Sequence, residues 1–288
     1  MIETLKFGSI LLTTFALFAC SNPSQKADSS IQTGSTNSTH IVLGSVGSDA
    51  QIWRFIASMQ ATKDAGLNIE VKELTDGIML NQGLIDQKLD VNAFQSWSYL
   101  KAFNGKNGNK LQAIATTYLE PMGLYSKRFK TLDQLPNGAT VIIPSDTANT
   151  ARALSLLNQV GLIQLKADFN PAVGNLNDIQ SNPKKFNIKL VQGATLPRVL
   201  DDVDLAAIGN TNALESGLNV IHDALVYEEN DEKVINNINL LVVNKNRIKE
   251  EKLQKLGALY HQPEVAEYVK QHFGGTKIDV NQNVNSFH

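Results

Sequence analysis

The sequence predicts an α/β protein made of two similar units with a ligand cleft between them. Its 288 residues suit one large or two ordinary domains. Segments typical of strands and of helices alternate along the chain, which indicates largely parallel sheets covered by helices. The alternation breaks at residues 119–128, where one extended segment follows another without a helix, and then it starts again. Because ligands of such folds bind where the carboxyl ends of strands meet, we expect the site in the gap between the units.

The composition is that of an ordinary folded protein. Hydrophobic residues make up 42% of the chain and charged residues 19%, and the formal net charge is −2. The sequence has no basic patch with interleaved aromatic residues, so it gives no indication of a nucleic-acid partner. The charge also gives no reason to expect strong attraction to a membrane surface.

The first residues have the pattern of a signal peptide. The apolar run at residues 10–19 is too short to span a bilayer comfortably and fits the core of a secretory leader. It ends at Cys20, the only cysteine of the chain, in a context that resembles a bacterial lipobox, although Phe18 is unusual there and Glu3 leaves the leader weakly basic. We expect residues 1–19 to be removed and Cys20 to be lipidated; an ordinary leader with an incidental cysteine is the alternative. The single thiol excludes an intramolecular disulfide.

Residues 20–39 are predicted to be the lipidated cysteine and a flexible tether. They are rich in Ser, Thr, Asn and Gln and have no apolar period. The folded part therefore begins near residue 40. We expect it to be lipid-anchored to a bacterial membrane and to face the periplasm or the cell exterior.

The first unit is predicted at residues 40–121. A helix that begins near Gly47 has an apolar face around Ile52 and Ile56, and Gly66 is expected to end it. The remaining segments alternate in the same way. The expected strands are 40–44, 68–74, 90–94 and 111–118, and the later helices are 78–88 and 96–103.

The second unit is predicted at residues 122–226, and residues 227–288 are predicted to return to the first. The return contains a strand at 238–243 and two helices that end near Gly274. In the second unit, we expect strands at 140–143, 188–191 and 204–208, helices at 149–160 and 194–200, and an extended segment at 224–228.

The helix that follows Pro144 is the most informative segment. Asp146, Thr147 and Asn149 are all capable N-caps, so several backbone N–H groups are expected to point out of the helix start. Arg152 lies in the first turns, where the helix dipole favours negative charge. A cation beside free N–H donors suits a small carboxylate, whereas an ordinary capped helix with a solvated arginine is the alternative.

Motifs of catalysis are missing from the sequence. It has no G-x-S-x-G nucleophile elbow, no H-E-x-x-H and no Walker loop. Its five histidines are dispersed and lack the spacing of metal ligands. We therefore expect a protein that is not an enzyme and that holds no metal and no cofactor.

Polar and aromatic residues at the ends of predicted strands suggest a binding site. Phe94, Trp97 and Tyr99 follow one strand and are expected to wall an apolar pocket, although each alone is more often a core residue. An asparagine side chain offers one acceptor and two donors, which suits an ammonium and a carboxylate. Two such asparagines lie at the ends of other predicted strands. For each, the alternative is an ordinary turn residue whose side chain bonds its own backbone. The asparagines are Asn210 and Asn239, and Tyr118 lies at the first crossing.

The whole chain resembles the NlpA/MetQ family of lipoproteins, the substrate-binding components of methionine ABC importers. The motifs that carry the resemblance run in the family's order. They are residues 90–95 (DVNAFQ) with Tyr99 and Leu100, 118–126 (YLEPMGLYS), 143–154 (IPSDTANTARAL), 201–208 (DDVDLAAI) and 213–218 (ALESGL). The resemblance implies a two-domain periplasmic-binding-protein fold of type II character that closes on an amino acid. It also implies an ABC permease and ATPase as partners.

The resemblance further implies roles for individual residues. Arg152 would pair with the ligand carboxylate, with Asn149 nearby at the helix start. Phe94 and Tyr99 would line the side-chain pocket. The ligand-binding set is then Arg152, Asn149, Phe94, Ser96, Trp97, Tyr99, Tyr118, Asn210 and Asn239.

Three positions depart from the family pattern. Gly77 stands where the family has Tyr, Ser96 where it has His, and Gly209 where it has Asn, with Asn210 one place later. We expect methionine or a close relative as the ligand, with a different amino acid or a short peptide as the alternative. An extracytoplasmic enzyme and a structural or adhesive lipoprotein with the same fold remain further alternatives.

Overall fold

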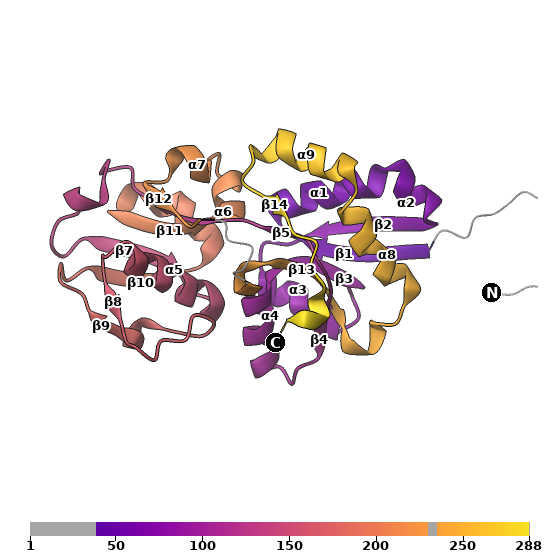
Figure 1. The fold of residues 1–288 in the computed structure, drawn as a ribbon, viewed down its shortest axis with the longest axis horizontal. Helices are drawn as coiled ribbons and strands as arrows, with labels where there is room; N and C mark the ends of the chain where they lie inside the picture. The colour runs from indigo at the N-terminus through magenta and orange to yellow at the C-terminus, as the bar shows by residue number, and fades with distance from the viewer. Residues whose placement is uncertain (1–38, 230–234, 288) are drawn as a thin grey trace, which may run out of the picture. The chain divides into compact units, whose positions relative to one another are not determined.

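A computed structural model describes residues 39–229 and 235–287, which form two mixed sheets with covering helices (Figure 1). The predicted signal peptide and Cys20 lie outside the described residues, as does all of the predicted tether except Thr39.

The first sheet has five strands in the order β2-β1-β3-β13-β4. The strands β2, β1 and β3 are parallel. This follows from the strand–helix alternation at the start of the chain, because a helix after each strand returns the chain to the same edge of the sheet. The strand β13 comes from the return segment and runs antiparallel to both of its neighbours. The strands are β1 (Thr39–Ser45), β2 (Leu67–Glu73), β3 (Val91–Ser96), β4 (Leu111–Thr116) and β13 (Asn239–Asn244).

Helices cover both faces of this sheet because its central strands are apolar on both sides. In β1, Ile41 and Leu43 pack into one core cluster, whereas Val42 packs against the other. The first cluster lies under α1 (Gly47–Ser58), α8 (Glu251–Tyr260) and α9 (Pro263–Phe273), and the second under α3 (Gly77–Ile85) and α4 (Trp97–Lys106). Burial on both faces explains why these strands read as continuous apolar runs.

The first helix ends earlier than the sequence predicts. It stops at Ser58, because Met59 is extended with ψ 149°, and a short helix, α2 (Gln60–Asp64), follows. The Ile56 carbonyl oxygen accepts from the Met59 backbone N–H at 3.2 Å and from the buried Thr62 hydroxyl at 2.5 Å, which satisfies it where the helix is interrupted. Gly66, with φ 71°, follows the second helix.

The second sheet has five strands in the order β10-β7-β11-β6-β12. The first two pairs are parallel, whereas β6 runs antiparallel to both β11 and β12. The expected helix at 194–200 is a 3₁₀ helix (Gly193–Asp202), and Pro197 inside it cannot donate a helical hydrogen bond. The strands are β6 (Met122–Tyr125), β7 (Thr140–Pro144), β10 (Asn187–Val191), β11 (Leu205–Gly209) and β12 (Val226–Tyr227), and the helices are α5 (Thr147–Gln159), α6 (Asn210–Glu215) and α7 (Val220–Asp223).

The chain passes from the first sheet to the second through β5 (Tyr118–Leu119). This strand pairs with β14 (Ile278–Asp279) near the carboxyl end of the chain, which holds the crossing against the first sheet. The chain returns after β12, which still pairs with β6 at Tyr227, one residue past the predicted boundary. A two-stranded sheet of β8 (Gln164–Leu165) and β9 (Ile179–Ser181) completes the strands of the described residues.

Three buried amides form a closed hydrogen-bond network between α3 and β3, and this network allows a test of the fold. The Asn81 amide nitrogen donates to Gln95 Oε1 at 3.0 Å, and its Oδ1 accepts from Asn92 and Gln95 at 2.9 and 2.6 Å. Leucine at position 81 would leave two buried amides short of partners, each at a cost of about 1–3 kcal/mol. We predict that Asn81→Leu lowers the free energy of unfolding in urea by that order.

The exposed Asn285 provides the control, because its side chain lies outside this network. Asn285→Leu should change the free energy of unfolding by less than about 0.5 kcal/mol. Equal effects of the two substitutions would contradict the role assigned to the network.

Candidate functional site

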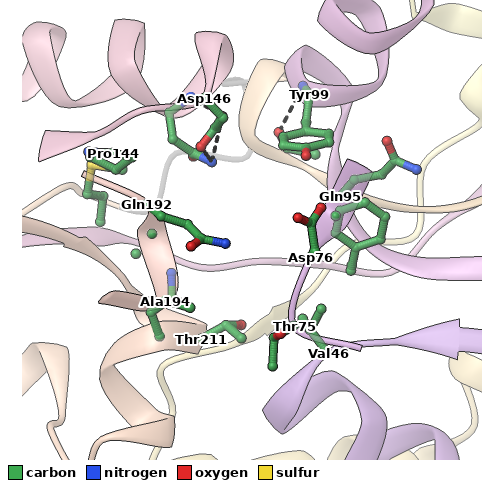
Figure 2. Close-up of a pocket in the computed structure, with 18 of the residues that line it drawn as sticks. Val46, Thr75, Asp76, Gln95, Tyr99, Pro144, Asp146, Gln192, Ala194 and Thr211 are labelled. Carbon is green, nitrogen blue, oxygen red and sulfur yellow. Dashed lines mark hydrogen bonds between the residues drawn. The ribbon is translucent and has the colours of Figure 1, made fainter. Parts of the chain in front are cut away.

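A cavity of about 320 Å³ lies between the segments that follow the strands of the two sheets (Figure 2). On one side, its lining comes from the segments after β1, β2 and β3 and from the start of β13. On the other side, it comes from the segments after β7, β10 and β11. This is the location expected for a ligand of an α/β protein.

The structure brings six of the nine predicted residues together at this cavity. They come from both sheets and from segments that are far apart in the chain. The six are Phe94, Ser96, Tyr99, Asn149, Arg152 and Asn239.

Three predicted residues do not line this cavity. Trp97 packs edge-on against Phe287, with ring centroids 5.6 Å apart. The Tyr118 hydroxyl donates to Asp49 at 2.5 Å, and the ring is buried in the first core cluster. Asn210, which is fully buried, donates from its amide to Glu120 Oε2 at 2.9 Å. In each case a neighbour that the sequence does not reveal holds the side chain behind the cavity wall.

Arg152 lines the cavity but is already paired with a carboxylate. Its Nε donates to both oxygens of Glu228 at 3.0 and 2.9 Å, and its Nη2 donates to Glu228 Oε2 at 2.5 Å and to the Glu120 carbonyl oxygen at 2.7 Å. The side chains of Arg152 and Glu228 are only 12% and 16% exposed. Burial lowers the pKa of the guanidinium, but Glu228 outweighs it and raises the pKa, so Arg152 stays charged. The arginine is thus not the free cation that the sequence suggests.

The start of α5 is capped by a carboxylate of the chain itself. Asp146 is the N-cap, and its Oδ1 accepts from the Asn149 backbone N–H at 2.9 Å. The Asn149 side chain also donates to both Asp146 oxygens at 3.1 Å. Burial raises the pKa of Asp146 despite these hydrogen bonds. A ligand carboxylate would therefore meet Asp146 at this helix start, where Asp146 already accepts from one of the backbone N–H groups.

An aromatic wall closes one side of the cavity. Phe94 and Tyr99 pack edge-on, with centroids 5.4 Å apart, and their rings lie against Gly77 at the start of α3. Burial, together with the charges of Asp146 and Asp76, raises the pKa of the Tyr99 hydroxyl, so it stays a neutral donor and acceptor. A wall of this kind suits an apolar or thioether group.

Four carboxyl groups line the cavity, and none of them is in the predicted ligand-binding set. Glu120 is paired with Lys277, whereas burial raises the pKa of Glu215, as do the charges of its acidic neighbours. The other two are Asp146 and Asp76, which accepts from the backbone N–H groups at the start of α3. Arg152 is already balanced by Glu228, so acidic side chains outnumber basic ones in the lining of the cavity.

The segment after β10 also contributes a residue that was not predicted. The side chains of Gln192 and Asp76 point toward each other across the cavity (Figure 2). Thr211, after β11, lines the same side as Gln192. Asp76, Gln192 and Thr211 follow strands that the sequence does predict, so the rule that ligands bind at the carboxyl ends of strands locates their segments but does not single out these residues.

No group of His, Cys, Asp and Glu in the described ranges could hold a metal ion. Within the same ranges, no helix has the length and hydropathy to cross a bilayer.

Two glycines of the cavity differ in the space around them. A Cβ on Gly77 would lie 2.4 Å from Phe94 Cε2 and 2.7 Å from the Tyr99 hydroxyl, whereas a Cβ on Gly209 would have no atom within 4 Å. We predict that Gly77→Ser lowers the free energy of unfolding by about 1–3 kcal/mol through overpacking. Gly209→Ser should not lower it, because serine is a good N-cap for α6. Denaturant titration of both variants checks this, and equal stabilities would contradict the tight packing at Gly77.

Comparison with known proteins gives a consistent result. The sequence profile of the NlpA lipoprotein family matches residues 41–281. "Outer membrane lipoprotein 2" of Mannheimia haemolytica is 37% identical over 273 residues, which are 93% of this chain and 95% of that protein. "Probable D-methionine-binding lipoprotein MetQ" of Haemophilus influenzae is 36% identical over 220 residues, which are 76% of this chain and 79% of that protein. A nutrient-binding protein from Burkholderia cenocepacia, solved bound to methionine, matches with a TM-score of 0.79 and 36% identity, covering 83% of this chain and 99% of that one.

Proposed function

Because this chain belongs to the NlpA lipoprotein family, we propose that it is the lipid-anchored substrate-binding component of an ABC importer. Its ligand is methionine or a close relative, delivered to a membrane permease and its ATPase. The observation that carries the proposal is the cavity between the two sheets, which places Arg152, Asn239 and the aromatic wall around one space. Relatives described as methionine-binding support the choice of ligand.

In this proposal, three groups of the ligand bind to different residues of the cavity. The ligand carboxylate binds Arg152 through Nη1, the edge that Glu228 does not use. The ammonium lies among the carboxylates and the amide of Asn239. The thioether packs on Phe94 and Tyr99, where sulfur–aromatic contacts contribute about 0.3–1.5 kcal/mol. The two units then close on the ligand by bending at the crossings.

A second candidate ligand is a different amino acid or a short peptide. Gly209 leaves open space in the cavity wall, and Ser96 supplies only a small hydroxyl that caps α4 through the Tyr99 backbone N–H at 3.3 Å. Both features enlarge the space available to a ligand relative to the family pattern. A panel of amino acids and dipeptides separates this candidate from methionine.

Calorimetric titration with L- and D-methionine tests the proposal. We expect saturable binding, with Arg152→Ala weakening it by about 3–5 kcal/mol because the ligand carboxylate is left buried and unpaired. This corresponds to roughly two to four decades in the dissociation constant. A melting curve of the variant shows whether it is folded, since the substitution also leaves Glu228 unpaired. Unchanged affinity in folded Arg152→Ala would sink the assignment of the carboxylate site.

A structural or adhesive lipoprotein is the remaining alternative, and its cavity would bind nothing. In that case no amino acid or peptide of the panel would raise the melting temperature. A ligand present at about 100 times its dissociation constant should stabilise a binding protein by roughly 2.7 kcal/mol.

We also propose that Cys20 anchors the mature protein through a lipid, with the folded part in the periplasm or on the cell exterior. The short apolar run before a single cysteine supports this assignment, and the family is one of lipoproteins. Cys20→Ser should release the protein from the membrane fraction of expressing cells, and the wild-type N-terminal peptide should carry a diacylglyceryl mass. Retention of the serine variant in the membrane fraction would contradict the anchor.

A further inference from the structure

The pair of Arg152 and Glu228 ties the cavity to both crossings of the chain. Arg152 lies on α5, in the second unit. Its Nη2 donates to the carbonyl oxygen of Glu120 on the first crossing, at 2.7 Å. Glu228 lies directly after β12, where the chain begins its return, and its Oε2 accepts from the Met122 backbone N–H at 2.8 Å. One buried ion pair therefore joins three segments.

Glu228 and the Glu120 carbonyl occupy one edge of the Arg152 guanidinium. A guanidinium has five N–H donors in a fixed plane. The single hydrogen of Nε and both hydrogens of Nη2 are used by Glu228 and by the Glu120 carbonyl. Among the described residues, no acceptor is bonded to Nη1 of Arg152, although this side chain lines the cavity. The two hydrogens of Nη1 are what remains for a ligand.

We infer that Glu228 is a positioning residue for the ligand carboxylate and acts through Arg152. The inference rests on the proposed function, because it assumes that an amino-acid carboxylate binds this arginine. Glu228 binds the Nε and Nη2 side of the guanidinium and so fixes the rotamer of Arg152. Nη1 is then already directed at the ligand before the ligand binds. It also satisfies the charge of Arg152 while the cavity is empty, so a free cation does not have to be buried there.

The chain offers a matched pair outside the cavity. Arg247 donates from Nε and Nη2 to the two oxygens of Glu250 at 2.5 and 2.8 Å, the same side-on geometry, and neither residue lines the cavity. Glu250→Gln therefore removes an arginine–glutamate pair of the same geometry without touching the proposed site, although Arg247 keeps a second carboxylate partner in Asp90. It controls for the general effect of losing an arginine–glutamate pair on the protein.

Glu228→Gln is the informative variant because it keeps the shape and removes the charge. With its oxygen in the place of Oε2, the amide nitrogen would face the Nε donor of Arg152, which now lies 3.0 Å from Oε1. Two donors repel at that contact, and Nε keeps only the acceptor at Oε2, 2.9 Å away. The guanidinium is then held by an uncharged group at one oxygen rather than by a carboxylate at two. We expect the affinity for L-methionine to fall about ten- to hundredfold, as when a group that orients a metal-binding histidine is removed.

Methioninamide distinguishes positioning from a structural role. It lacks the carboxylate, so its weaker binding should change little in Glu228→Gln, and the preference of the wild type for L-methionine over L-methioninamide should largely disappear. Glu250→Gln should keep the wild-type preference. Glu228→Asp, which retains the charge on a shorter side chain, should keep part of it and serves also if the glutamine variant does not fold.

The outcomes separate the two proposals. If the wild type binds methionine and Glu228→Gln keeps the wild-type preference for the carboxylate, the positioning role is overturned and the proposed function stands. Equal weakening of both ligands would make Glu228 a structural residue only and would also overturn the inference. If the wild type binds no methionine, the proposed function fails and the inference fails with it.

Discussion

The junction of the two sheets depends on one buried ammonium group. Lys277 Nζ is fully buried and lies 2.9 Å from Asp49 Oδ1, 2.7 Å from Glu120 Oε2 and 3.1 Å from the Thr211 hydroxyl, with the Tyr118 ring 3.9 Å away. Burial lowers the pKa of the lysine, but the two carboxylates outweigh it and raise the pKa, so the group stays charged. A buried ion without partners costs several kcal/mol. Segments from α1, the first crossing and α6 must therefore meet at this point.

Glu120 links this cluster to Arg152, the cation that lines the cavity. Its side chain binds Lys277, and its backbone carbonyl accepts from Arg152, which in turn is paired with Glu228 on the return crossing. Each crossing thus carries a buried carboxylate that is paired with a buried cation. In the proposed closing motion, the crossings bend while the bonds of Glu120 and Glu228 to the two cations stay intact, or while a ligand takes the place of one bonded group. This connects the occupancy of the cavity to the hinge through Glu120 and Glu228.

The sequence predicted the elements well and the contacts of the site less well. Strand–helix alternation placed nearly every strand, because apolar periodicity is a local property of the chain. The partners of Arg152, Asn210 and Tyr118 could not be predicted in the same way. Glu228 lies 76 residues from Arg152, and Lys277 lies 157 residues from Glu120. Such pairs form only when the two sheets have assembled, so no local pattern reveals that an apparently free cation or asparagine is already satisfied.

The pairing of Arg152 with Glu228 changes how the cavity can recognise a zwitterion. Since Glu228 balances Arg152, a ligand carboxylate gains directed hydrogen bonds from Nη1 rather than the attraction of an uncompensated cation. The carboxyl groups of Asp76 and Asp146, which come from opposite sides of the cavity, accept hydrogen bonds from the backbone at the starts of α3 and α5, and the charge of Asp146 also acts on Arg152. Charge therefore favours the ammonium of the ligand, and geometry selects its carboxylate. In the proposed binding mode, a ligand with an ammonium and no carboxylate would be attracted to the cavity but poorly oriented in it, so orientation rather than net charge would limit the specificity of the site.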